Sequence, residues 1–115
     1  METKIYEWPT QNGKILQIKG EVDLYSAPGL FTTITSIVEK GPSALHLDLS
    51  GVEYLDSSGV GTIIKTLQLV KNRGTAITFS GISGSPRKVL SMANILPLLQ
   101  EIPVPKELSE LSLTH

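Results

Sequence analysis

Residues 44–64 read ALHLDLSGVEYLDSSGVGTII, and this stretch decides the fold class. Residues 44–49 alternate in polarity with a period of two, which is the pattern of a half-buried strand whose inward residues are Leu45, Leu47 and Leu49. From Val60 the period changes to that of a helix, because apolar residues recur at 60, 63, 64, 67 and 70. Asn72-Arg73-Gly74 then supplies a helix stop. The stretch predicts a strand that leads, after a short connection, into an amphipathic helix.

The flanking segments repeat this alternation of strands and helices. A strand is predicted over residues 14–22, and the turn dipeptide Asn12-Gly13 makes Thr3–Trp8 its hairpin partner. Ser26-Ala27-Pro28 opens a helix that ends at Gly41-Pro42. After residue 74 we expect a strand over 75–80, a shorter helix from Ser85-Pro86 capped by Ser85, a Pro-interrupted edge strand near Leu99–Val104, and a short helix from Lys106 with Leu108 and Leu111.

Strand–helix–strand units imply parallel pairing with right-handed crossovers. The strands nevertheless keep one polar face, which carries His46, Asp48 and Thr78, so helices should cover mainly the other face. We therefore predict a single α/β domain over residues 1–115, with a mixed four- to five-stranded sheet and helices mainly on one face. His46 is expected at the surface or at the edge of the core rather than as a metal ligand. Trp8 and Tyr6 are expected to cover the sheet edge.

Composition excludes several classes of function. Ten Lys and Arg residues against eleven Asp and Glu give a net charge of −1, without the basic excess of a nucleic-acid or polybasic membrane-binding protein. The chain has no Cys and only two His, which excludes disulfides, thiolate zinc sites and histidine-rich metal sites. No apolar run approaches the ~18 residues of a membrane span. We expect a cytoplasmic protein that needs no metal and no cofactor.

The densest group of polar residues is Tyr54-Leu55-Asp56-Ser57-Ser58-Gly59-Val60-Gly61, at the start of the predicted second helix. Amide groups and the positive end of the helix dipole favour an anion there, so a phosphoryl group on a serine would be tolerated. The alternative is plain N-capping. The residues do not form a nucleophile elbow, a dinucleotide fingerprint or a P-loop.

A second acidic motif, Gly20-Glu21-Val22-Asp23, ends the strand before the first helix. Its carboxylates should lie near the same end of the sheet as Asp56. Clustered carboxylates can hold a metal or act as acid and base. The alternative is an exposed turn in which Asp23 helps the chain into its helix.

Together with Leu47-Asp48-Leu49-Ser50, these motifs resemble the STAS domain family, specifically the bacterial anti-sigma factor antagonists, from about Ile15 to Leu111. The resemblance implies a non-enzymatic binding module. In its unphosphorylated form it would bind an ATP-binding anti-sigma factor serine kinase and release a sigma factor, and a phosphatase would restore it after phosphorylation. Ser57 is the implied phosphoacceptor, in an environment formed by Asp23, Asp56, Ser58 and Gly59.

We expect a monomer or weak dimer that makes no direct contact with nucleic acid or membrane. The alternative function is that of a STAS subunit in a membrane-associated or stressosome-type assembly. The motifs do not identify the sigma factor, the kinase, the phosphatase or the stimulus.

Overall fold

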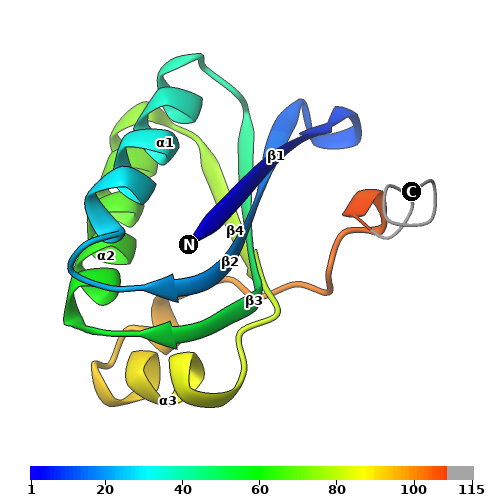
Figure 1. The fold of residues 1–115 in the computed structure, drawn as a ribbon. Helices are drawn as coiled ribbons and strands as arrows, with labels where there is room; N and C mark the ends of the chain where they lie inside the picture. The colour runs from blue at the N-terminus through cyan, green and yellow to red at the C-terminus, as the bar shows by residue number, and fades with distance from the viewer. Residues whose placement is uncertain (109–115) are drawn as a thin grey trace.

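The sheet has four strands in the order β1-β2-β3-β4, and the computed structural model describes residues 1–108 (Figure 1). The hairpin strands β1 (Glu2–Trp8) and β2 (Gly13–Val22) are antiparallel. β3 (Ala44–Leu55) pairs in parallel with β2 on one side and with β4 (Ala76–Ser80) on the other. The predicted mixed sheet is thereby confirmed, with β3 at its centre.

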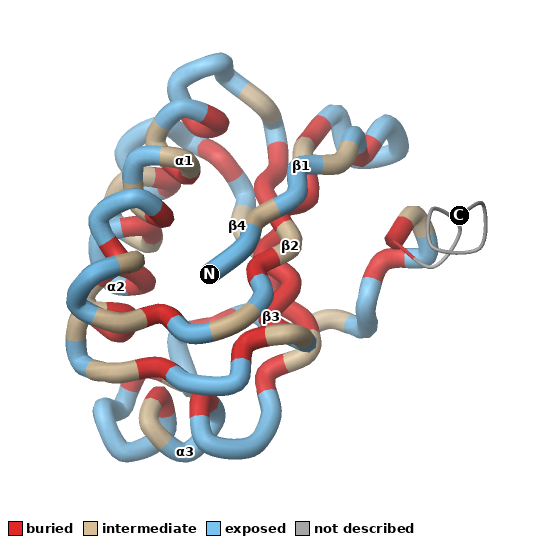
Figure 2. The backbone as a smooth tube through the Cα atoms, in the orientation of Figure 1, coloured by how far each residue is buried: buried red, intermediate tan, exposed pale blue. Residues whose placement is uncertain are grey.

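Helices α1 (Ala27–Glu39) and α2 (Ser57–Arg73) cover one face of the sheet (Figure 1). The third helix, α3 (Gly84–Met92), packs against β3. Two short 3-10 helices, η1 (Pro9–Gln11) and η2 (Leu96–Leu98), lie after β1 and after α3. The main core lies between the sheet and α1 and α2, where the apolar stripes of both helices are buried (Figure 2). The prediction of helices mainly on one face is confirmed.

Local turn signals lie where the sequence placed them. Asn12 adopts a left-handed conformation at the end of η1, and Trp8 pairs with Gly13 across the hairpin. Gly74 has a φ of 69° and its N–H bonds back to the carbonyls of Lys71 and Val70, which ends α2.

Three element predictions are wrong. β3 continues to Leu55 instead of ending at residue 49, because β3 carries one extra residue at each of two irregularities opposite β2, and the pairing resumes past Gly51. The segment 99–104 is no fifth strand: it makes a single parallel bridge, Phe79 to Glu101. The prolines on either side of Leu98–Ile102 have no N–H to extend a ladder. Ser83 rather than Ser85 occupies the N-cap of α3. Residues 106–108 are helical as predicted, and Leu111 lies outside the described residues.

The sheet face opposite the helices is covered as well. A second apolar cluster gathers there, formed by Trp8, Ile15, Ala44 and Leu108 with Tyr6 and Ile102 packed against it. The segment after η2 supplies part of this cover (Figure 1). His46 is consequently 0% exposed, with the Trp8 ring edge-on at 5.5 Å between centroids. The expected surface or edge position of His46 is therefore wrong, because its polar face is not solvated.

A relay of hydrogen bonds satisfies the buried polar groups on this face. Ser80 Oγ donates to Asp48 Oδ1 at 3.0 Å, so the Ser80 oxygen must accept from His46 Nε2 at 2.6 Å. The other ring nitrogen, Nδ1, then accepts from Thr78 Oγ1 at 2.8 Å. The relay fixes a neutral His46 with its proton on Nε2, and burial lowers the pKa of His46 to about 4 although Asp48 opposes this.

We expect the domain to lose stability in mild acid because of His46. In the unfolded chain the imidazole takes up a proton below about pH 6.5, whereas in the folded protein it does so only near pH 4. The free energy of unfolding should therefore fall as the pH drops from 6.5 to 4, by up to about 3 kcal/mol. Urea denaturation at a series of pH values measures this, and His46→Gln should give a flatter profile across the same window. Equal slopes for both proteins would contradict the assignment.

Candidate functional site

Parallel pairing of β2 with β3 brings the two acidic motifs to one end of the sheet. Val22 is paired with Leu55, and the Asp56 N–H donates to the Val22 carbonyl at 3.3 Å. Asp23 and Asp56 each follow these paired residues directly, so both carboxylates lie at the carboxyl ends of neighbouring strands. The expectation that Asp23 lies near Asp56 thus has a direct structural basis.

Asp56 is the N-cap of α2. Its Oδ1 accepts from the N–H groups of Ser58, at 2.9 Å, and Gly59, at 3.2 Å. The Ser57 side chain is exposed and that of Ser58 is half-buried. The amides that we expected to attract a phosphoryl group are thus already bonded to a carboxylate, and capping by Asp56 is what the motif does in the unmodified protein. A phosphate on Ser57 would lie beside this negative charge.

Gly59 serves the packing of α2 on the sheet. A Cβ on Gly59 would lie 2.3 Å from Leu55 Cδ1 and 3.2 Å from Val22 Cγ1. A larger residue would force either the buried Leu55 side chain or the first turn of α2 to move. Gly59 therefore holds the helix start, with Ser57 on it, in contact with the core.

Asp23 organises the turn into α1. Its Oδ1 accepts from the N–H groups of Tyr25 and Ser26, both at 3.0 Å. Ser26 Oγ in turn donates to the Glu21 carbonyl at 2.9 Å and accepts from the Asp23 N–H. The pKa of Asp23 is lowered, mainly by the bond from the Ser26 N–H. Asp23 helps the chain into its helix, and its carboxylate remains charged beside the start of α2.

Two further acids add to the negative charge at this end of the sheet. Glu21 and Glu53 are exposed near the ends of β2 and β3. We call the four residues Glu21, Asp23, Glu53 and Asp56 the acidic pole. The N-terminal ammonium of Met1 also acts on Asp23, and Met1 and Lys19 line a hollow with Glu53. An added phosphate on Ser57 would meet repulsion above all from Asp56, the N-cap directly before it.

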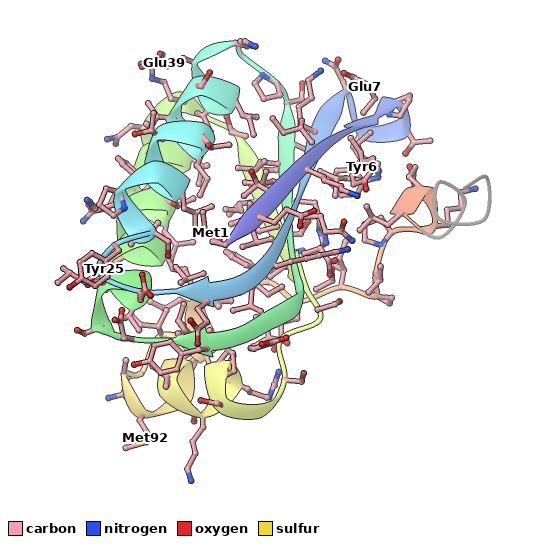
Figure 3. All side chains as sticks on the ribbon, viewed as in Figure 1. Met1, Tyr6, Glu7, Tyr25, Glu39 and Met92 are labelled. Carbon is pink, nitrogen blue, oxygen red and sulfur yellow. The ribbon has the colours of Figure 1, made fainter. Side chains whose placement is uncertain are left out.

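The sequence reasoning missed an exposed apolar ridge next to Asp23. Leu24 is 65% exposed and Tyr25 is 89% exposed, although the bonds around Asp23 hold the turn rigidly. Tyr25 projects away from the domain beside the start of α1 (Figure 3). The only signal was that both residues fall between the strand pattern and the helical stripe. Adjacent exposed apolar side chains mark interaction sites, and Tyr is among the residues enriched at protein-binding hot spots.

Within residues 1–108, no group of three or more His, Cys, Asp or Glu side chains is placed to hold a metal ion. Across the same part of the chain, no helix is both long and apolar enough to cross a membrane.

Comparisons with known proteins agree on one family. Residues 7–110 match the family model of the STAS domain. An anti-sigma-B factor antagonist of Bacillus subtilis is 34% identical over 73 residues, which are 64% of this chain and 66% of that protein, just under two thirds of its length.

Solved structures show the same fold. An anti-sigma factor antagonist from Mycobacterium paratuberculosis has a TM-score of 0.79 at 23% identity, covering 90% of this chain and 86% of that one. The Bacillus cell fate determinant SpoIIAA in its phosphorylated form has a TM-score of 0.69 at 17% identity, covering 97% and 99%.

Proposed function

Because this chain belongs to the STAS domain family, we propose that it is an anti-sigma factor antagonist that is switched off by phosphorylation of Ser57. The observation that carries the proposal is the position of Ser57. Its side chain is exposed on the first turn of a helix that is fixed to the core, next to the Asp56 cap and the acidic pole. A kinase can reach the hydroxyl there, and a partner can cover it.

The unphosphorylated hydroxyl is neutral. Burying it under a partner costs only the desolvation of one uncharged polar group. Phosphorylation adds about −1.5 to −2 charges. These charges would have to lose their hydration on docking, and they would lie next to Asp56 and at the same end of the sheet as Asp23. We propose that this difference lets the unmodified form bind an anti-sigma factor kinase, so that a sigma factor is released, and makes the modified form dissociate.

In this scheme the chain catalyses nothing. The anti-sigma factor serine kinase binds ATP and transfers its γ-phosphoryl group to the Ser57 oxygen, releasing ADP. A phosphatase hydrolyses the phosphate in the cytoplasm. The acidic pole repels the phosphate and does no acid–base work. Turnover of a substrate by the purified chain, abolished by Asp23→Ala while partner binding stays intact, would refute this part of the proposal.

We predict that the kinase modifies Ser57 and not Ser58. Ser57 is exposed, whereas Ser58 is half-buried on the side of α2 that faces α1. Incubation with kinase and ATP should add one phosphate to the wild type and to Ser58→Ala, and none to Ser57→Ala. Ser58→Ala should change the free energy of unfolding by less than about 1 kcal/mol, because Asp56 supplies the cap.

Peptide mapping by mass spectrometry reads the position of the phosphate. Phosphate on Ser58, or on Ser57→Ala at the wild-type level, would refute the assignment of the site. A chain that binds a transporter or a multi-subunit scaffold and is not phosphorylated by any anti-sigma kinase would favour the alternative function instead.

A further inference from the structure

A groove runs between the N-terminal halves of α1 and α2, next to the phosphorylation site proposed above. Its walls come from both helices and the turn before α1, and include Leu24, Pro28, Phe31, Ser58, Gly61 and Lys65. The ridge formed by Leu24 and Tyr25 continues this surface outward. The groove is thus a mainly apolar channel that adjoins the acidic pole.

Gly61 leaves the side of the groove open. A Cβ built on Gly61 meets no atom within 4 Å. Glycine inside a helix lowers its stability relative to alanine, and nothing in the described domain requires glycine at this position. At Gly59, two residues earlier, a Cβ would by contrast collide with the Leu55 side chain. The space beside Gly61 is available to an approaching molecule.

Lys65 places a positive charge at the groove. Its Nζ lies 4.7 Å from the centroid of the Phe31 ring. Among residues 1–108 it forms no ion pair, although four carboxylates lie at the neighbouring pole. The stacked position orients the ammonium group without neutralising it. A bound acidic side chain would find an unpaired cation beside an apolar channel.

We infer that this groove takes an apolar side chain of the anti-sigma partner and that Lys65 pairs with a carboxylate next to that side chain. The inference rests on the proposed function, because the groove begins at Ser58, next to Ser57 at the start of α2. A second copy of this chain fits poorly: a two-fold contact through this surface brings like patches together, and hence two acidic poles. The exposed ridge extends the contact beyond the size of a small ligand and favours a protein.

The test measures affinity for the purified anti-sigma factor kinase of the same genome, without ATP, by isothermal titration calorimetry. Gly61→Leu fills the groove and Lys65→Glu reverses the charge, and each should weaken binding at least tenfold. Lys65→Met keeps an aliphatic side chain against the Phe31 ring, so it should lose less affinity than Lys65→Glu does. Lys71→Glu is the matched control, since Lys71 is exposed near the far end of α2, and it should stay within twofold of the wild type.

Thermal melts show whether each variant is folded, and Gly61→Ala is the milder replacement if Gly61→Leu is not. Wild-type affinity in Gly61→Leu and Lys65→Glu would overturn the inference and leave the proposed function standing. Equal losses in Lys65→Glu and Lys71→Glu would overturn it too, because they would indicate a long-range effect of charge. Failure of the wild type to bind would refute the proposed function itself. Self-association of the wild type that Gly61→Leu abolishes, seen by sedimentation, would assign the groove to a second copy and overturn the inference.

Discussion

Ser57→Asp should weaken binding to the anti-sigma partner about 100-fold or more. The change places a permanent carboxylate on the exposed first turn of α2, where a partner would cover it beside Asp23 and Asp56. An uncompensated charge buried in an interface costs about 3–5 kcal/mol, and each 1.4 kcal/mol is tenfold in affinity. Titration calorimetry with the anti-sigma factor kinase, without ATP, measures the loss, and Ser57→Ala should bind within a few fold of the wild type.

Ser36→Asp provides the matched control for this experiment. Ser36 is an exposed serine near the other end of α1, so the same added charge there should leave binding almost unchanged. Similar losses in both variants would mean that net charge, rather than a contact at Ser57, governs the affinity. Full binding by Ser57→Asp would remove the physical basis of the proposed switch.

Leu47→Asp should unfold the domain. Leu47 is at the centre of β3, 2% exposed, with Leu16 and Phe79 as its neighbours on β2 and β4. The substitution removes apolar contacts worth about 2–5 kcal/mol and buries an unpaired carboxylate for several more. The sum, about 5–10 kcal/mol, is comparable with the whole stability of a typical small domain, about 5–15 kcal/mol.

Circular dichroism during thermal melting tests the Leu47 prediction. Ile5→Asp is the control, because Ile5 lies on the edge strand β1 with its side chain half exposed. That variant should melt within a few degrees of the wild type. A cooperative transition for Leu47→Asp near the wild-type temperature would show that the core does not require an apolar side chain at position 47.

The sequence was sufficient for elements whose local and tertiary signals agree. The stripe from Ala27 to Val38 and the alternation at 44–49 predicted α1 and the buried half of β3, and both are present. Beyond Leu49 the alternation breaks at Ser50-Gly51, so the second half of β3 could not be read locally. It depends on irregular pairing with β2, and such pairing is a property of two strands together.

For the candidate site, sequence reasoning predicted the residues but not their surroundings. The motif spacing placed Asp23, Asp56 and Ser57 at one end of the sheet. It could not show that Asp56 already occupies the helix amides, nor that Leu24 and Tyr25 are exposed. Alternation also made the face with His46 look solvated. The residues that cover this face include Trp8 and Leu108, which lie far from His46 along the chain.

The lack of space at Gly59 has a consequence for how a partner would tell the two forms apart. Because the side chains of Leu55 and Val22 fill the space beside Gly59, the first turn of α2 cannot move closer to the sheet to relieve repulsion around a modified Ser57. Outward movement would open the core between α2 and the sheet. Both forms of the protein should then share one backbone, and a partner would discriminate between them by electrostatic potential at a surface of constant shape.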